Sequence, residues 1–206
     1  MCGRFIMIPK DELNRIIADV KKNLEKQKHA SVSAEYQDVY PKADVPIIVP
    51  ESGRLEVAVM RWGYERAWSK MPLFNTRADT ALRPSAGGKP NMWADSLERR
   101  RCVVPSYGFY EPHKTETYPS PKTGKPIKRQ YQFHLPDSDT VMMAGIYEDG
   151  HFSIMTTDPN RWMESIHPRM PVVLLPDEVD VWLHGGPDEY ERLFDRSRIT
   201  LVDEAI

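Results

Sequence analysis

The second residue of the chain, Cys2, has the most distinctive chemistry in the sequence. Once Met1 is removed, this one residue carries both a free α-amine and a thiol. An α-amine with a pKa of about 8 is partly neutral at neutral pH and attacks an aldehyde to form an imine. The neighbouring thiolate can then close a five-membered thiazolidine ring, because the second step is intramolecular. The alternative interpretation is an ordinary residue at a frayed terminus.

Three further polar residues stand where packing alone does not require them. Asn75 lies in a polar stretch of a long loop and can donate and accept hydrogen bonds at once. Glu111 follows two aromatic residues, and a carboxylate beside aromatic surface can have a raised pKa and act as an acid. His167 precedes Pro168, which favours an extended conformation at the histidine. Taken singly, each has a structural alternative: a turn residue, a solvated strand end and a structural histidine.

The composition is that of a folded domain. The chain has 206 residues, of which 40% are hydrophobic and 28% charged, and these values exclude a disordered or fibrous chain. No run of about 18 apolar residues is present, and the segment MCGRFIMIPKDELNR lacks a signal-peptide pattern, so we expect no membrane span and no leader. The length predicts a single domain over residues 1–206. A net charge of −2 predicts no attraction of the whole molecule to nucleic acid, although a local basic groove can still bind it.

The cysteine count and the missing motifs bound the chemistry further. Two cysteines are too few for a disulfide framework, and they fit a reducing cytosol. Cys102 lies inside a strand-like run and is interpreted as a buried small hydrophobe. The patterns HxH, HExxH, CxxC and GxSxG and a glycine-rich phosphate loop are absent. We therefore expect no metal and no cofactor.

The hydrophobic patterning predicts one helix, then many strands, then short helices. Apolar residues at helical spacing predict a helix over residues 10–29, and the long segment 64–96 reads mostly as loop. A segment rich in Pro, Lys and Thr, residues 112–129, is predicted to be a mobile insertion between strands. The predicted strands cover residues 45–50, 55–62, 101–110, 130–135, 140–147, 152–157 and 170–175, and the final helices cover residues 176–184 and 187–194. This order favours an α+β fold with a mainly antiparallel, barrel-like sheet and flanking helices.

Six segments carry a resemblance to a known family. They are, in chain order, MCGRF (1–5), RWGYERAW (61–68), NTRADT (75–80), RCVVPSYGFYE (101–111), MAGIYE (143–148) and IHPRMPVVL (166–174). In this order and spacing the chain resembles the SOS response-associated peptidase (SRAP) family over nearly its whole length. Each motif is weak by itself, but their combination with a cysteine at position 2 is specific.

The resemblance implies a DNA damage response protein that binds single-stranded DNA and captures abasic sites. It implies a compact α+β domain with a barrel-like sheet and a positive groove. The implied activity is a lyase-like covalent DNA–protein crosslink through Cys2, preceded by autopeptidase removal of Met1. We expect a cytoplasmic monomer that associates with the nucleoid through DNA and has no membrane partner. Carried over motif by motif, the catalytic positions are Cys2, Asn75, Glu111 and His167, and the DNA contacts are Arg4, Pro41, Trp68, Arg77 and Thr156.

The chemistry of these residue types agrees with the implied roles. An abasic deoxyribose is in equilibrium with an open aldehyde, the electrophile that an N-terminal cysteine captures. Glu111 can shuttle protons to the carbinolamine hydroxyl, His167 can protonate the sugar ring oxygen, and Asn75 can orient the Cys2 amine. Trp68 offers a face for stacking on a base.

Arginines supply the candidate phosphate contacts, and a few positions depart from the family pattern. Arg4 and Arg77 can pair with phosphates. The family pattern has Asn where this chain has Asp38, and Trp where it has Pro112. Pro168 likewise stands where Asp is usual. None of these departures removes a proposed catalytic group.

Two alternative functions use the same residues. One is an N-terminal-nucleophile cysteine hydrolase or peptidase, in which Cys2 works with His167 or Glu111 on an amide. The other is a noncovalent module for single-stranded DNA, which the near-zero net charge disfavours as the sole role. Arg4, Arg77 and Trp68 around one groove would favour DNA, and a closed small-molecule pocket would favour a hydrolase.

Overall fold

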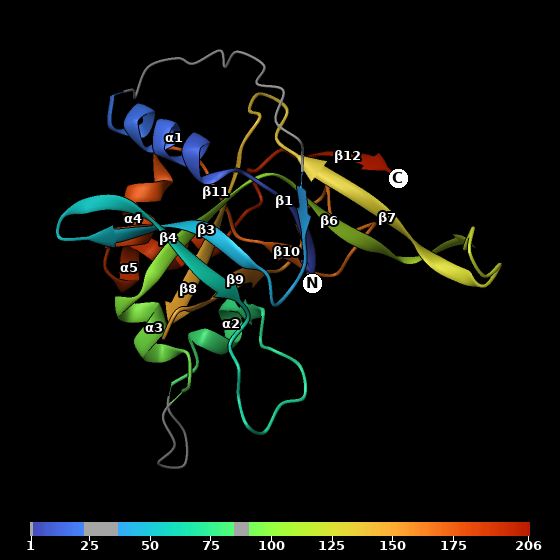
Figure 1. The fold of residues 1–206 in the computed structure, drawn as a ribbon, viewed down its shortest axis with the longest axis horizontal. Helices are drawn as coiled ribbons and strands as arrows, with labels where there is room; N and C mark the ends of the chain where they lie inside the picture. Colours follow the sequence, from blue (N-terminus) through green and yellow to red (C-terminus); the bar gives the residue numbers. More distant parts are fainter. Residues whose placement is uncertain (1, 23–36, 85–90) are drawn as a thin grey trace.

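The computed structural model describes residues 2–22, 37–84 and 91–206, and one mixed sheet of twelve strands dominates it (Figure 1). The strands are β1 (Arg4–Met7), β2 (Gln37–Val39), β3 (Asp44–Glu51), β4 (Arg54–Trp62), β5 (Asn75–Arg77), β6 (Arg101–Pro119), β7 (Pro126–His134), β8 (Val141–Glu148), β9 (His151–Thr157), β10 (Met170–Pro171), β11 (Val173–Leu174) and β12 (Val202–Ala205). The helices are α1 (Lys10–Lys22), α2 (Ala78–Ala81), α3 (Ala94–Arg99), α4 (Glu178–His184) and α5 (Pro187–Tyr190), followed by a 3-10 turn, η1 (Glu191–Phe194). Within the described ranges, no helix is long and apolar enough to cross a membrane.

The sheet folds back on itself around one long strand. Its main path runs β11-β8-β9-β4-β3-β6-β1-β2, and β6 also pairs with β8. The pairing of β6 with both β3 and β8 closes part of the path, which makes this part of the sheet barrel-like. Most pairs are antiparallel, but β4 and β5 each run parallel to β9. The α+β class is therefore confirmed, with a sheet that is mixed rather than wholly antiparallel.

Strand β6 links the barrel-like part of the sheet to the N-terminal strand. Its first residues, from Arg101 to Ser106, pair with β8, and its later residues pair with β1 and β7. In the β1 ladder, Arg4 lies opposite Tyr110 and Phe5 lies opposite Phe109. The N-terminus of the chain is thereby held beside the middle of the longest strand.

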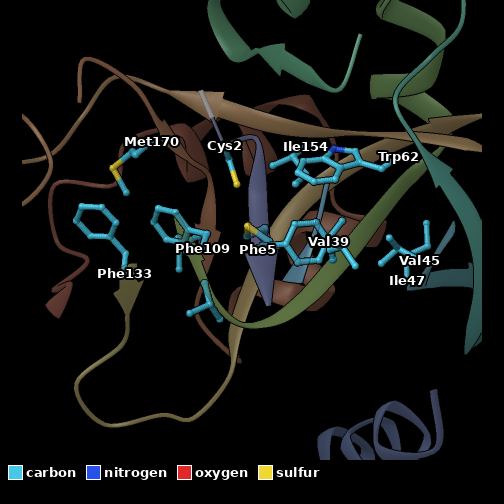
Figure 2. Packing of buried hydrophobic residues seen from close by; sticks show 14 of the residues in the cluster. Cys2, Phe5, Val39, Val45, Ile47, Trp62, Phe109, Phe133, Ile154 and Met170 are labelled. Atoms are coloured by element: carbon cyan, nitrogen blue, oxygen red, sulfur yellow. The ribbon is translucent and has the colours of Figure 1, made fainter. Parts of the chain in front are cut away.

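Two clusters of buried side chains hold the layers together. Figure 2 shows part of the first, in which Phe5, Trp62 and Phe109 pack between the sheet strands. The ring centroids of Phe5 and Trp62 lie 4.8 Å apart, and the indole nitrogen of Trp62 donates to the carbonyl of Phe74 at 2.9 Å. The second cluster lies under the helices and includes Trp182 of α4. Burying such large apolar side chains supplies the main driving force for this fold.

The apolar face of helix α1 packs against the sheet, as the helical spacing of its apolar residues predicts. It follows Pro9, carries two carboxylates in its first turn, and buries Leu13 and Ile17, which are four residues apart on one face. The hydroxyl of Tyr107 on β6 donates to Glu12 and ties the helix to the sheet. Helix formation is confirmed from residue 10 to residue 22, and the rest of the predicted range, to residue 29, extends outside the described residues.

Two segments predicted as irregular contain regular structure. The segment 64–96 holds β5, α2 and the start of α3, so its interpretation as mostly loop was wrong for these parts. The segment 112–129 is largely strand, because β6 runs on to Pro119 and β7 begins at Pro126. Proline ends hydrogen-bonding ladders but is tolerated on a two-stranded ribbon, whose edges face solvent. The Pro-rich composition therefore marked a ribbon rather than an insertion without structure.

Candidate functional site

Cys2 is brought to Glu111 by the pairing of β1 with β6. Arg4 lies opposite Tyr110 in this antiparallel ladder, and Cys2 precedes Arg4 by two residues, so it reaches past Tyr110 toward Glu111. The Cys2 side chain has no exposed surface, and its Sγ lies 3.7 Å from the carbonyl oxygen of Arg4. In Figure 2 the thiol points in among the core side chains, with Phe109 and Phe5 nearby.

The environment of Cys2 keeps its thiol protonated in this state. Burial raises the pKa of the Cys2 thiol, and the negative charge of Glu111 raises it further. A thiolate is the reactive form of cysteine, so the thiol must lose its proton to a neighbouring base when it reacts. Burial also raises the pKa of the Cys102 thiol, which is fully buried on β6 as its sequence context predicted. Only Cys2 has a carboxylate close enough to raise its pKa in this way.

Asn75 fixes the backbone of Cys2 from the opposite side. It begins β5, which runs parallel to β9 with Asn75 opposite Ile154. Its Nδ2 donates to the carbonyl oxygen of Cys2 at 2.8 Å. Its Oδ1 is buried and has no hydrogen-bond partner in the part of the chain that the structure describes. An acceptor held so close to Cys2 is well placed to orient an amine or a hydroxyl of a reacting group.

Glu111 and His167 form an acid–base pair. The Nε2 of His167 lies 3.6 Å from Oε2 of Glu111, and Glu111 is fully buried while 13% of the His167 side chain is exposed. Burial raises the pKa of Glu111 from its ordinary 4.5 to about 7, and burial lowers the pKa of His167. The carboxyl is thus poised to gain or lose a proton near neutral pH, and the imidazole is predominantly neutral there.

The turn after His167 sets the orientation of its ring. Its Nδ1 lies 2.8 Å from the carbonyl oxygen of Arg169 and 3.2 Å from the backbone nitrogen of the same residue. The shorter contact favours a proton on Nδ1, which leaves Nε2 as an acceptor facing Glu111. A protonated Glu111 can then donate toward the imidazole. Proton transfer between Glu111 and His167 needs only a small shortening of the distance between Oε2 and Nε2.

Arg169 anchors this turn, and sequence reasoning did not single it out. Its side chain donates to Asp158 at 2.5 Å and to the carbonyl of Thr156 at 2.8 Å, and it approaches Asp79 at 3.5 Å. The available signal was its place in the segment IHPRMP, two residues after His167. Only the tertiary structure shows that its guanidinium reaches strand β9.

The four predicted catalytic residues therefore meet at one place. Cys2 contacts Asn75 through a hydrogen bond, its thiol is close enough to Glu111 for the carboxylate to raise its pKa, and Glu111 faces His167. Three separate parts of the sheet supply them: the start of β1, the start of β5 and the middle of β6, with His167 just before β10. The described ranges hold no cluster of His, Cys, Asp or Glu that could bind a metal ion. The site has the groups for nucleophilic attack and proton transfer.

Two of the predicted DNA contacts, both arginines, are paired with carboxylates. Arg4 donates through Nε to Asp38 at 2.9 Å and stacks on the ring of Tyr110, 3.9 Å from its centroid. Arg77 binds Asp79 through two nitrogens, at 3.0 and 2.8 Å. Neither carboxylate was among the predicted site residues. Both pairs are partly exposed to solvent, so a phosphate can compete for either arginine.

The other predicted DNA contacts differ in exposure. Trp68 is 69% exposed, which suits a side chain that stacks on a base, and Pro41 is partly exposed. Thr156 is fully buried, and its hydroxyl lies 3.4 Å from the carbonyl oxygen of Thr76. Thr156 pairs with Arg77 in the β5–β9 ladder, so the two residues lie side by side on neighbouring strands. Its side chain does not itself reach the surface.

Comparison with known proteins shows the family of the chain. A family model described as SOS response associated peptidase (SRAP) matches residues 1–201. The abasic site processing protein YoqW of Bacillus subtilis (strain 168) is 28% identical over 198 residues, which span 89% of this chain and 80% of that protein. The abasic site processing protein YoaM of the same strain is 30% identical over 179 residues, 77% of this chain and 73% of that protein. The abasic site processing protein HMCES of Rattus norvegicus is 26% identical over 234 residues, 90% of this chain and 65% of that protein.

The fold is shared with solved structures. The crystal structure of a protein from Bacteroides thetaiotaomicron aligns with a TM-score of 0.69 at 24% identity, covering 100% of this chain and 92% of that one. A phage-related protein from Bordetella bronchiseptica aligns with the same TM-score at 20% identity, covering 100% of this chain and 94% of that one. At such identities the likeness concerns the fold. The family model, however, spans nearly every residue described here. The chain belongs to the SOS response associated peptidase (SRAP) family.

Proposed function

We propose that this protein processes abasic sites in single-stranded DNA by forming a covalent thiazolidine through Cys2 once Met1 has been removed. The observation that carries the proposal is the meeting of Cys2, Asn75, Glu111 and His167 at one site. The names of the relatives, which are abasic site processing proteins, support the choice of substrate. We further propose that the protein acts as a DNA-damage-response enzyme.

The proposed capture proceeds in two bond-forming steps. The neutral Cys2 amine adds to the C1′ aldehyde of the ring-opened sugar, and the resulting carbinolamine loses water to give an imine. The Cys2 thiol then adds across the C=N bond, so that sulfur bonds to C1′ and the thiol proton is transferred to nitrogen. The net reaction joins protein and DNA with loss of one water molecule.

Glu111 and His167 supply the proton transfers in this scheme. With a pKa of about 7, Glu111 can protonate the leaving hydroxyl of the carbinolamine and, once ionised, accept the thiol proton. His167 sits on the exposed side of Glu111, where it can protonate the sugar ring oxygen during opening and exchange protons with the carboxyl. The buried Oδ1 of Asn75 can accept a hydrogen bond from the reacting amine.

Removal of Met1 uses the same groups. The Cys2 thiol attacks the Met1 carbonyl carbon, the peptide bond breaks, and the freed amine takes a proton. Water then hydrolyses the thioester and releases methionine, so one peptide bond is cleaved with one water molecule. Glu111 is the proposed base for the thiol and the proposed acid for the leaving amine.

The DNA path is proposed to run over the exposed candidate contacts. Trp68 offers a stacking face, Pro41 an apolar one, and Arg4 and Arg77 provide guanidinium groups for phosphates. Thr156 lies beside Arg77 on the neighbouring strand, and its buried side chain is not proposed to contact the DNA. We propose that the protein acts on DNA as a monomer.

A mass measurement on the crosslink tests the proposal. Incubation with single-stranded DNA containing an abasic site should yield a heat-stable adduct, with the mass of the protein lacking Met1 plus that of the oligonucleotide minus one water. Cys2→Ala should bind DNA without forming this adduct, and Cys102→Ser, which changes an equally buried thiol, should form it normally. An adduct of the same mass from Cys2→Ala would show that the thiazolidine scheme is wrong.

A second candidate, amide hydrolysis on a foreign substrate, draws on the same thiol, carboxyl and imidazole. The paired Glu111 and His167 beside a cysteine favour it chemically. Such a hydrolase would release peptide or amide products in many turnovers and leave no adduct on abasic DNA. The mass measurement therefore separates the two functions.

A further inference from the structure

Beyond Glu111, strands β6 and β7 continue together as a two-stranded ribbon that projects from the body of the molecule (Figure 1). We call residues 112–130 the basic arm. Its outer part is paired between Thr117 and Lys128 and between Pro119 and Pro126, and the turn lies between these prolines. All residues from 121 to 128 are exposed, so this ribbon buries little and presents most of its surface to solvent.

The basic arm concentrates positive charge. Its single carboxylate is Glu116, and its five basic residues are Lys114, Lys122, Lys125, Lys128 and Arg129. The whole chain carries a net charge of −2, so this excess is local. The ammonium groups of Lys122 and Lys125 make no ion pair or hydrogen bond with the residues that the structure describes. A two-stranded ribbon with unpaired cations at its tip attracts a polyanion.

Contacts at the base connect the arm to the catalytic site. The backbone nitrogen of Lys114 donates to the carbonyl of Ile166 at 2.7 Å, and its Nζ donates to the carbonyl of Glu164 at 2.8 Å. Ile166 immediately precedes His167, and the arm itself begins right after Glu111. The arm is therefore held by the same stretches of backbone that hold the acid–base pair.

Further contacts stiffen the lower half of the arm. Glu116 forms an ion pair with Arg129 at 2.7 Å and accepts a hydrogen bond from the hydroxyl of Tyr131 at 2.8 Å. The guanidinium of Arg129 also lies over the ring of Tyr118, 5.0 Å from its centroid. These contacts cross between the two strands, so the tip lysines stand on a preorganised support. Preorganisation lowers the entropic cost of binding a partner.

We propose that the basic arm binds the phosphate backbone of the DNA strand that flanks the reacting nucleotide. This inference rests on the proposed function and extends its DNA path beyond the candidate contacts on the body. Residues 111–119, extended at about 3.3 Å each, place Pro119 at most roughly 26 Å from Glu111, and the tip lysines lie beyond Pro119 in the turn. A strand stacked as in a B-form duplex advances about 3.4 Å per nucleotide, so the tip lies roughly 8 or more stacked nucleotides from the site, and fewer if the single strand is stretched. The arm reads no base, so its contribution is independent of sequence.

Lysine and proline residues on an exposed ribbon can also serve only to prevent aggregation. They keep an exposed strand edge from pairing with another chain. The two roles make different predictions, because protection has no effect on the affinity of a monomer for DNA. The salt dependence of DNA binding therefore decides between them.

The experiment compares charge-matched double variants of the full chain. Lys122→Gln with Lys125→Gln removes two cations from the tip, and Lys10→Gln with Arg54→Gln removes two from the starts of α1 and β4. Binding is measured by fluorescence anisotropy over a range of salt concentrations. The probes are single-stranded oligonucleotides with a stable tetrahydrofuran abasic analogue, one too short to reach the tip and others extended by roughly 10 nucleotides on the 5′ or the 3′ side.

The tip variant should bind one of the extended oligonucleotides several-fold more weakly and lower its salt slope by about 1.4, or about 0.7 for each lost phosphate contact. It should match the wild type in affinity for the short oligonucleotide. With a separate oligonucleotide that carries a reactive, ring-opening abasic site, it should also match the wild type in crosslink yield at saturating protein. The side on which the effect appears gives the polarity of the bound strand. Equal slopes for the tip variant, the control variant and the wild type on all probes would overturn the proposal. Loss of crosslinking by the wild type itself would instead overturn the proposed function.

Discussion

The imidazole of His167 faces the carboxyl of Glu111, with Nε2 3.6 Å from Oε2, at a point where Glu111 has no exposed surface. Burial shifts the pKa values of both groups, that of Glu111 upward to about 7 and that of His167 downward. The shifts reverse the usual order of the two proton affinities, so near neutral pH the carboxyl can hold a proton while the imidazole beside it is neutral and can accept it. The thiol of Cys2 lies close enough to feel the same carboxylate.

Glu111→Gln should slow both removal of Met1 and crosslink formation. An amide cannot exchange protons, so we expect rate losses of about 100-fold or more in each step. The matched control is Glu116→Gln, which changes a carboxylate of the same strand that pairs with Arg129 instead of facing the site. Intact mass spectrometry of protein made in a cell-free system without aminopeptidase measures the first step, and a denaturing gel measures the second. Normal Met1 loss in Glu111→Gln would remove Glu111 from the processing step.

The stability of the protein should fall as pH rises through the range in which Glu111 ionises. Its pKa is raised from 4.5 to about 7 in the folded state, so between these values the folded protein holds a proton that the unfolded chain has lost. The free energy of unfolding then decreases with pH across this window and levels off above pH 7, by at most about 3 kcal/mol. Glu111→Gln should remove this part of the dependence, as urea denaturation at a series of pH values would detect. Parallel pH curves for the two proteins would contradict the raised pKa.

Crosslinking should show a matching pH dependence. If the ionised Glu111 accepts the thiol proton in the slow step, the rate constant at saturating DNA should rise through an inflection near pH 7. The inflection should be absent in Glu111→Gln, whatever its residual rate. An inflection that persists in this variant belongs to another group, such as the Cys2 amine, and would reassign the titration.

Removal of a carboxylate beside a candidate phosphate contact should strengthen DNA binding. Asp79→Asn frees the guanidinium of Arg77 from its two-point pair and should tighten binding of single-stranded DNA by up to about five-fold, since an exposed ion pair is worth at most about 1 kcal/mol. Arg77→Ala should weaken binding and lower the salt slope by about 0.7. Asp95→Asn, which alters an exposed pair on α3, is the control. If Asp79→Asn and Arg77→Ala both bind DNA with the affinity of the wild type, the DNA does not contact Arg77.

Asn75→Ala tests whether Asn75 positions Cys2 for the reaction or only stabilises the fold. The variant loses the hydrogen bond to the Cys2 carbonyl, which we expect to cost about 1 kcal/mol of stability. The crosslinking rate should fall much further, by about 10-fold or more, because the Cys2 backbone is no longer held and the buried acceptor is gone. Thermal unfolding and single-turnover crosslinking measure the two effects. If the crosslinking rate falls by no more than the loss of folded protein accounts for, Asn75 has only a structural role.

Much of the secondary structure follows from local sequence. Strands over residues 45–50 and 55–62 were predicted from two apolar runs, and β3 and β4 confirm both of them as the two arms of a hairpin. Strand and helix positions in the last third of the chain also follow their apolar runs. Short elements such as β5 could not be predicted in this way, because three residues held by pairing with β9 carry no periodic signal. Likewise, the ribbon at residues 112–130 was hidden by its prolines, which signal a loop when no partner strand is known.

The sequence by itself determined which residues could carry the chemistry, because residue type sets what a group can do. A cysteine at position 2 offers an amine and a thiol, and Asn75, Glu111 and His167 matched motifs in a fixed order. Only the tertiary structure decided that β6 brings Glu111 beside Cys2, that burial lifts its pKa toward neutrality, and that Arg4 and Arg77 are held by Asp38 and Asp79. The physical reason is that proton affinity and charge pairing depend on distance and desolvation, which are set by contacts between residues far apart in the chain.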